Sequence, residues 1–447
     1  MCHGSLFSQI FRFSLPLMGA NIMALMFHAA DLIVLGQFAP REIRTAATAA
    51  VGATAALNIL LLIFFFGFSA GVNSITARYV GAKEYDKVSR TVHTSIAIGL
   101  YGGIFFALLG IFGSRTVLNW MGTPPDVIDK AVIYMQICSI GLPFTIIYTI
   151  GAAILRAVGD TRRPLVFIII SGIVNVILNL FFVAVCKMDA AGVAVATKIS
   201  NALSAILVLR VLIKSDSEIK LVLKHIRIHW DMLKEVLWIG IPAGIQGALY
   251  CVSNVIIQSS VNSLGSCIMA GNAASQSLEG MANVASGAYY QSSMSFTGQN
   301  LGGKKYNRVI NSIWICLLYV TLFSFICCGI FLLFGRELLS LYNPEPDVVN
   351  AGMQRLIIMM STYFICGISD TLSGALRGLG HSVKPTLTTV FGACIFRIFW
   401  VFAIFPQYRT LRNLSISYPV SWLIISSINA LILFYICRPY FLSRERK

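Results

Sequence analysis

The sequence is poor in charged residues, and above all in acidic ones. Only 12% of its 447 residues are charged, and only 18 are Asp or Glu. A soluble domain carries roughly 25% charged residues on average. This shortage excludes soluble globular and disordered proteins, and the 57% share of hydrophobic residues indicates a chain that lies mostly in a lipid bilayer.

Familiar motifs of catalysis, metal binding and nucleotide binding are also missing. The eleven cysteines are scattered without a C-x-x-C pair, and no H-E-x-x-H, Walker A or G-x-G-x-x-G pattern occurs. Residues 67–71 read GFSAG, but they lie in an apolar run, where small residues favour helix packing over nucleophilic catalysis. His225 and His229 have no third ligand nearby in sequence. We therefore expect no metal, no organic cofactor and no ATP-driven step within this chain.

Long apolar stretches follow one another along the chain. A transmembrane helix needs about 20 apolar residues. Twelve stretches qualify, at 10–37, 46–77, 88–113, 130–156, 164–186, 190–213, 234–263, 267–298, 309–334, 350–376, 385–405 and 416–437. The sequence therefore predicts an all-α polytopic membrane protein with twelve transmembrane helices.

The basic residues predict which side of the membrane each loop occupies. An even number of spans places both termini on one side. Of 34 basic residues, 23 fall in segments on that side and nine, Arg355 among them, on the other, while Lys198 and Arg397 fall within spans. Because cytoplasmic loops carry the excess of Lys and Arg, both termini are predicted to be cytoplasmic. The net charge of +16 follows these short loops, so it does not indicate nucleic-acid binding.

One sizeable polar stretch divides the chain. Residues 214–233, KSDSEIKLVLKHIRIHWDML, lie between a predicted N-lobe at 1–213 and a predicted C-lobe at 234–447. Their apolar members recur at helical spacing, at Ile219, Leu223, Ile226 and Trp230. This pattern predicts an amphipathic cytoplasmic linker on the membrane surface.

The two lobes are related by an internal repeat. YVGAKEYDKV at 79–88 resembles NLGGKKYNRV at 300–309, and AAILRAVGDTRRP at 152–164 resembles SGALRGLGHSVKP at 373–385, both with an offset of 221 residues. Six helices per repeat give both halves the same orientation in the membrane. Transporters built from such parallel repeats bind substrate near the midplane between the halves.

Three acids lie deep within predicted spans: Asp31, Glu279 and Asp370. A charge at that depth costs about 2.5–3.5 kcal/mol on insertion scales, so each needs a reason. One interpretation is cation or proton coupling, with Glu279 also able to pair with a cationic substrate and Asp370 at the inner gate. The other is a neutral, hydrogen-bonded acid that packs helices. Asn58 takes the place of Glu279 in the first repeat, so we assign Asn58, Glu279 and Asp370 to a substrate cavity, with Asp370 nearest the cytoplasmic end.

Polar side chains also line two neighbouring spans of the N-lobe. Asn175 and Asn179 are four residues apart and hence on one helix face, and Thr197 and Asn201 repeat that spacing on the next span. Their oxygens suit Na⁺ or a hydrogen-bond relay. Ordinary hydrogen bonds between helices explain them equally well.

Five segments together resemble the multidrug and toxic compound extrusion (MATE) transporters. They are LPLMGANIMALMFHAADLIVLGQFA, GAAILRAVGDTRRP, SGIVNVILNLFFV, SFTGQNLGGKKY and SGALRGLGHSVKP. The resemblance extends over nearly the whole chain and implies two six-helix lobes in a V shape that open alternately to either side. It also implies export of cationic or amphipathic organic compounds in exchange for H⁺ or Na⁺.

The resemblance gives several residues an expected role. Asp31 matches the acid of the family's first helix, and Asn175, Asn179 and Thr197 match positions around a cation or proton site. Asn179 stands where some relatives have Asp, so the N-lobe would hold one carboxylate. Glu279 matches an acid seen in a subset, and His28 stands where Asn often occurs.

The resemblance therefore implies an antiporter of small organic compounds. We expect it to lie as a monomer among membrane lipids in a plasma (inner) membrane. A lipid-linked oligosaccharide flippase is the nearest alternative, but such proteins usually have 14 helices and more arginines facing the cavity. A polytopic membrane enzyme or a channel is a more distant alternative.

Overall fold

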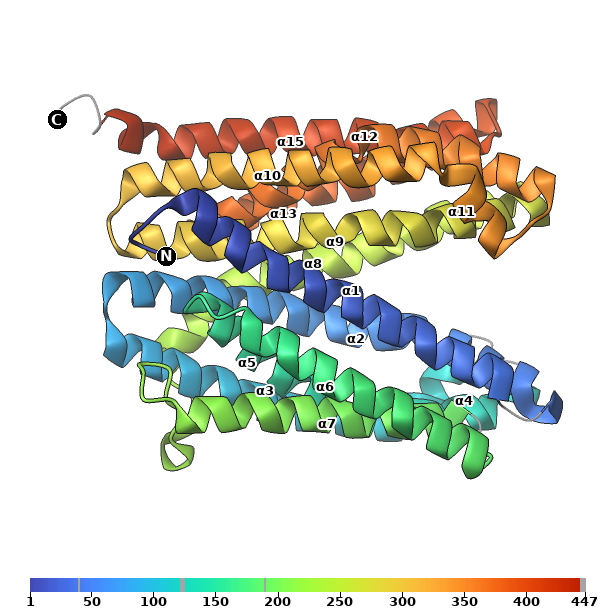
Figure 1. Ribbon diagram of the computed structural model, residues 1–447, viewed down its shortest axis with the longest axis horizontal. Helices are drawn as coiled ribbons and strands as arrows, with labels where there is room; N and C mark the ends of the chain where they lie inside the picture. Colours follow the sequence, from blue (N-terminus) through green and yellow to red (C-terminus); the bar gives the residue numbers. More distant parts are fainter. Residues whose placement is uncertain (39–40, 121–124, 189, 443–447) are drawn as a thin grey trace. The chain divides into compact units, whose positions relative to one another are not determined.

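The computed structural model describes residues 1–38, 41–120, 125–188 and 190–442, without the side chains of residues 28, 32, 35–38, 41–61, 125–127, 190 and 440–442 (Figure 1). Within these ranges the chain is helical and contains no strand. Nine helices in the described part are long and apolar enough to cross a membrane, or ten when the pair α4 and α5, bent by 41°, is counted as one span. The predicted all-helical, multi-span fold is confirmed.

Each predicted span corresponds to one helical segment of the described chain. The segments are α1 (Leu6–Phe38), α2 (Arg41–Ala82), α3 (Tyr85–Trp120), α4 with α5 (Pro125–Ile140, Leu142–Ala157), α6 with the π-helical η1 (Arg162–Asn179, Leu180–Val185), α7 (Ala190–Lys214), α8 (Trp230–Asn262), α9 (Ser266–Gly302), α10 (Tyr306–Leu333), α12 (Pro346–Gly378), the run α13–η3–α14–η4–η5 (Val383–Thr389, Val390–Ile395, Phe396–Phe399, Trp400–Ile404, Phe405–Gln407) and α15 (Leu411–Leu442). A short helix, α11 (Gly335–Tyr342), joins α10 to α12.

The chain forms two compact units. The N-unit contains residues 19–80 and 84–237, and the C-unit contains residues 1–18, 81–83 and 238–447. Within the N-unit α3 packs against α4 and α5, and α7 packs against α4, α5 and α6. Within the C-unit α12 packs against α9, α10 and α15, as Figure 1 also shows.

Small residues let α9 and α12 approach closely in the C-unit. Gly374 and Gly378 form a G-x-x-x-G pair on α12. A Cβ at Gly374 would lie 2.3 Å from the Tyr290 carbonyl oxygen, and one at Gly378 would lie 2.5 Å from that of Met294. Larger residues would force the helices apart, because backbone atoms cannot yield as a flexible side chain can.

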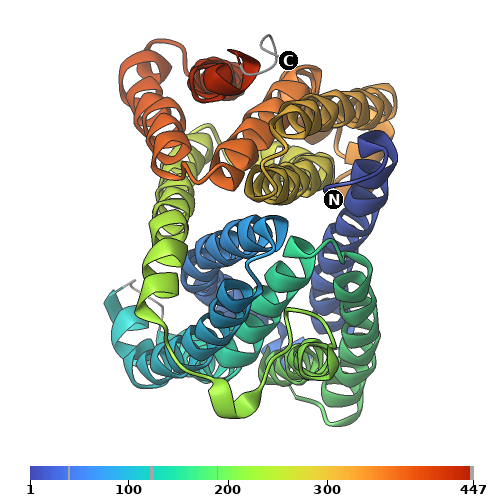
Figure 2. The same cartoon turned by 90° about the vertical axis from the view of Figure 1, so that its left-hand side faces the viewer.

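The linker is mostly non-helical, although four of its apolar residues recur at helical spacing. Between α7 and α8 the chain has only the 3-10 turn η2 (Leu223–His225) and is otherwise non-helical (Figure 2). Ile219 is buried while Leu223 is exposed, so these residues do not share one face. The Nε2 atom of His93 accepts a hydrogen bond from the Val222 amide at 3.0 Å. Tertiary contacts with α3 therefore take the place of a helical ladder.

The internal repeat is visible in the backbone of the described helices. Lys83 and Lys304, 221 residues apart, both have a positive φ, of 60° and 54°, and Gly159 and Gly380 share it at 100° and 89°. The same hydrogen bonds close the paired turns, with Asp160 N donating to Leu155 O and His381 N to Leu376 O. This is the Schellman pattern that ends helices. The repeat thus preserves backbone geometry as well as residue type.

Candidate functional site

The four residues that the sequence predicts for cation coupling meet in the N-unit. Asp31 lies on α1, Asn175 and Asn179 on α6, and Thr197 on α7. The Asn179 amide donates to Oδ1 of Asp31 at 2.5 Å and to Oδ1 of Asn175 at 3.2 Å. The Thr197 hydroxyl lies 3.4 Å from Oδ2 of Asp31, and Asn175 donates to that hydroxyl at 3.3 Å. The carboxylate on α1 is therefore surrounded by amide and hydroxyl groups from two other helices, α6 and α7.

This cluster contains an oxygen that no described group satisfies. The side chain of Asn179 is 0% exposed, and its Oδ1 atom accepts no hydrogen bond from the described residues. An unsatisfied buried acceptor costs about 1–3 kcal/mol. Together with the Asp31 carboxylate and the Asn175 and Thr197 oxygens, it forms an oxygen-rich set of the kind that hard cations prefer.

A glycine brings α1 and α6 together one turn below this cluster. A Cβ on Gly172 would lie 1.8 Å from the ring of Phe27. Phe27 is four residues before Asp31, and Gly172 is three residues before Asn175. Because residues three or four apart share a helix face, the contact of Phe27 with Gly172 aligns the two polar faces. Gly172 is thus a positioning residue that the sequence reasoning did not identify.

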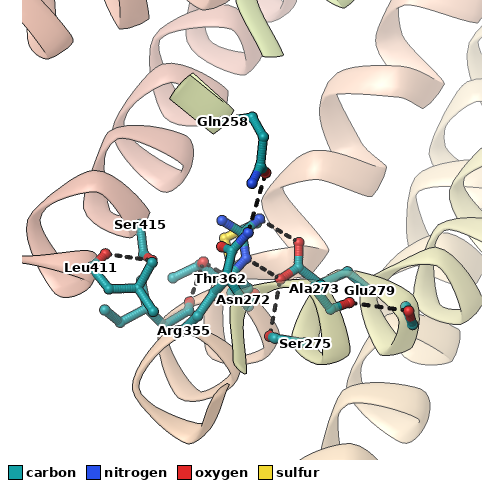
Figure 3. Close-up of polar contacts among 12 residues, drawn as sticks. Gln258, Asn272, Ala273, Ser275, Glu279, Arg355, Thr362, Leu411 and Ser415 are labelled. Atoms are coloured by element: carbon teal, nitrogen blue, oxygen red, sulfur yellow. Dashed lines mark hydrogen bonds and ion pairs between the residues drawn. The ribbon is translucent and has the colours of Figure 1, made fainter. Parts of the chain in front are cut away.

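In the C-unit, Glu279 is held by an arginine (Figure 3). Arg355 donates from Nε to Oε1 of Glu279 at 2.7 Å and from Nη2 to Oε2 at 2.8 Å, and Ser275 donates to Oε1 at 3.2 Å. The exposed fraction is 2% for Arg355 and 8% for Glu279. This bidentate geometry is the strongest that an arginine and a carboxylate form. The carboxylate of Glu279 is therefore neutralised from within the protein.

The assignment of Arg355 to an outer segment was wrong, because it lies on α12 and is buried. Two further arginines, Arg377 on α12 and Arg397 on α14, are also buried in the C-unit. Arg377 donates to the hydroxyl of Tyr290 at 2.5 Å and to Oε1 of Gln246 at 2.7 Å. The sequence itself indicates that Arg355 lies within a helix, since position 355 falls inside the predicted span 350–376.

The other predicted residues are not gathered into one site. Asp370 is half-buried on α12, and within the described chain it forms no hydrogen bond or ion pair. The side chains of Asn58 and His28 lie outside the described residues. Among the residues that are described, no group of three or more His, Cys, Asp or Glu side chains could hold a metal ion.

This fold, with polar side chains buried inside apolar helices and a duplicated plan, is that of a membrane transporter. The family model MatE matches residues 16–181 and 242–402, and the chain belongs to that multidrug and toxic compound extrusion (MATE) family. It is therefore a multi-pass membrane protein and a transporter.

Named relatives agree with this membership. The chain is 28% identical over 400 residues to the probable multidrug resistance protein YpnP of Bacillus subtilis, an alignment that covers 89% of this chain and 87% of that protein. It is 20% identical over 386 residues to the multidrug export protein MepA of Staphylococcus saprophyticus, covering 86% and 84%.

Solved structures share the fold. An outward-facing MATE family transporter of the MOP superfamily matches with a TM-score of 0.88 at 18% identity, covering 99% of this chain and 98% of its own. A MOP superfamily transporter from Pyrococcus furiosus matches with a TM-score of 0.90 at 18% identity, covering 97% and 96%. The binding pocket of that transporter has a reverse polarity, which suggests a different function for it.

Proposed function

We propose that this transporter is a cation-coupled antiporter that exports small organic compounds, with Asp31 as the group that exchanges the coupling ion. The polar cluster around Asp31 supports this proposal, because it brings one carboxylate and several neutral oxygens into the interior of a helical unit. A carboxylate in such surroundings exchanges a proton or binds Na⁺ as its environment alternates. No cofactor enters this scheme, since the ion gradient supplies the energy.

The proposed setting follows the charge distribution. Both termini and the linker would be cytoplasmic, the protein would act as a monomer in the plasma (inner) membrane, and lipid would cover its apolar helices. The relatives named for multidrug resistance and export support organic substrates. Membership of a transporter family weighs against a polytopic enzyme.

A lipid-linked oligosaccharide flippase is the second candidate. Buried Arg397 of the C-unit favours it, because its partners are neutral hydroxyl groups and a phosphate-bearing headgroup pairs with a guanidinium group. The twelve helical segments of the described chain weigh against it. Vesicles that move a labelled polyprenyl phosphate, and no soluble dye, under an imposed ion gradient would favour the flippase.

Asp31→Asn tests the antiporter directly. The change keeps the size and the hydrogen bonding of the side chain but removes its titratable charge. In vesicles that load a fluorescent organic compound, we expect efflux driven by a proton or sodium gradient to fall to the rate measured without a gradient.

Asp129→Asn is the matched control, since Asp129 is an exposed acid of the same unit that pairs with Arg115. This variant should retain driven efflux. Driven efflux at the unmodified rate in Asp31→Asn would reduce Asp31 to a packing residue. Comparing the two gradients also identifies the coupling ion.

A further inference from the structure

Arg397 lies in an unusual stretch of the C-unit. Its four-residue helix α14 stands between the π-helical segments η3 and η4. Such π segments disturb the regular hydrogen-bond ladder and occur frequently at functional sites. The side chain is 0% exposed, so its guanidinium group lies wholly inside the unit.

The partners of Arg397 are all neutral. Its Nε donates to the Ser421 hydroxyl at 2.9 Å, and its Nη1 donates to the Tyr250 hydroxyl at 3.3 Å. The guanidinium carbon lies 4.2 Å from the centre of the Tyr418 ring. Its Nη2 atom is buried without a hydrogen-bond acceptor among the described residues. Hydroxyl and aromatic groups orient a guanidinium, but they do not neutralise it.

Comparison with Arg355 shows what Arg397 lacks. Glu279 neutralises Arg355, whereas no carboxylate of the described chain forms an ion pair with Arg397. Both guanidinium groups contact the same ring, because Arg355 lies 4.9 Å from the centre of Tyr418. The Nη1 of Arg355 is also buried without a partner in the described part of the chain. Glu279, Arg355 and Arg397 together therefore carry one positive charge in excess. An uncompensated buried charge lowers the stability of the fold.

We propose that Arg397, with Tyr250, Ser421 and the ring of Tyr418, binds the carboxylate group of an organic substrate. Substrates of this transporter would then be organic anions or zwitterions, and not the cations that an unpaired Glu279 would attract. This inference rests on the proposed export of small organic compounds. Tyr250 is half-buried, so one of the side chains that contact Arg397 reaches the surface of the unit. A planar guanidinium matches a carboxylate with two parallel hydrogen bonds, and the tyrosine rings suit an aromatic body.

Binding of labelled benzoate to the purified full-length protein, measured by equilibrium dialysis in chloride-free buffer, tests this site. Benzamide and benzylammonium serve as neutral and cationic probes with the same ring. We expect saturable binding of benzoate, and binding of the two other probes weaker by about tenfold or more. Arg397→Gln should weaken benzoate binding by a similar factor. Arg336→Gln, which changes a surface arginine of the same unit that contacts Asn350, should not.

Several results would overturn the inference: no benzoate binding by the unmodified protein, equal binding by Arg397→Gln, or displacement of benzoate by benzylammonium. Displacement by an equal concentration of chloride would assign the site to inorganic anions and would also overturn it. If Arg397→Gln does not fold, Tyr250→Phe removes only the hydroxyl and should still weaken benzoate binding measurably.

Dialysis uses no gradient, so this test is separable from that of Asp31. Benzoate binding that persists without driven efflux would contradict the antiporter alone. Driven efflux of organic cations without benzoate binding would contradict the anion site alone.

Discussion

Charge pairing inside the C-unit decides what each ionisable residue can do. Glu279 and Arg355 are 76 residues apart in sequence, on α9 and α12, and they form two buried hydrogen bonds. A buried pair of this kind contributes little net stability, because desolvation offsets attraction, but loss of one partner leaves a bare charge. The pair therefore acts as a constraint on the local structure more than as a source of stability.

Removal of one partner should lower the free energy of unfolding far more than removal of both. We expect Arg355→Met and Glu279→Gln each to lower the free energy of unfolding, by about 3–5 kcal/mol where a bare buried charge is left. The double variant should recover most of that loss. Thermal unfolding of the four proteins in detergent, treated as a double-mutant cycle, measures the coupling. Additive losses would show that the two side chains do not act as a pair.

The sequence predicted half of this residue-scale picture. Spacing along single helices placed Asn175 and Asn179 on one face, and the structure brings them to Asp31. The sequence could not indicate that Arg355 is the partner of Glu279, because a single sequence does not show that α9 and α12 are neighbours. The coupling role of Asp31 and the cavity roles of Asn58, Glu279 and Asp370 stay predictions.

At the scale of helices, small residues determine which elements come into contact. Gly172 on α6 leaves room for the Phe27 ring of α1. The linker shows that helical spacing of apolar residues does not by itself make a helix. Periodicity reports only which residues could share a face, whereas Ile219 and Leu221 are buried by tertiary contacts in a non-helical segment.

Gly172→Val should separate α1 from α6 and disturb the hydrogen bond between Asn179 and Asp31. We expect a loss of about 1–3 kcal/mol in stability, as for other overpacked sites, together with impaired driven efflux. Melting temperature and vesicle efflux measure the two effects. Gly113→Val provides the control, because a Cβ at Gly113 meets no atom within 4 Å. Phe27→Ala should partly rescue the Gly172 variant, and failure to do so would argue against this contact as the cause.

At the scale of the whole molecule, the composition and the internal repeat predicted most of the fold. The twelve apolar stretches map onto the helical segments of the described chain, since hydrophobic length is a property of one segment at a time. The lobe boundaries and the membrane orientation stay predictions. They depend on how segments combine and on the bilayer.

Orientation can be measured by labelling single cysteines in a variant from which the eleven native cysteines are removed. A cysteine at Lys224 should react only with reagents that reach the cytoplasm, and one at Glu345 only with reagents outside the cell. The excess of basic residues near Lys224 is the physical reason. Labelling of position 224 from outside would overturn the proposed topology.

The turns at Lys83 and Lys304 have a consequence for how the chain enters the membrane during synthesis. A left-handed backbone costs a residue other than glycine roughly 1–2 kcal/mol, and glycine would avoid that cost at both places. Lysine stands at both, with its side chain exposed. If both loops are cytoplasmic, as the excess of basic residues predicts, each ammonium group would add to the charge that retains its loop on the side where synthesis takes place. On that topology, lysine at these two positions lowers the stability of the turn but favours the correct orientation of the chain during insertion, once in each repeat.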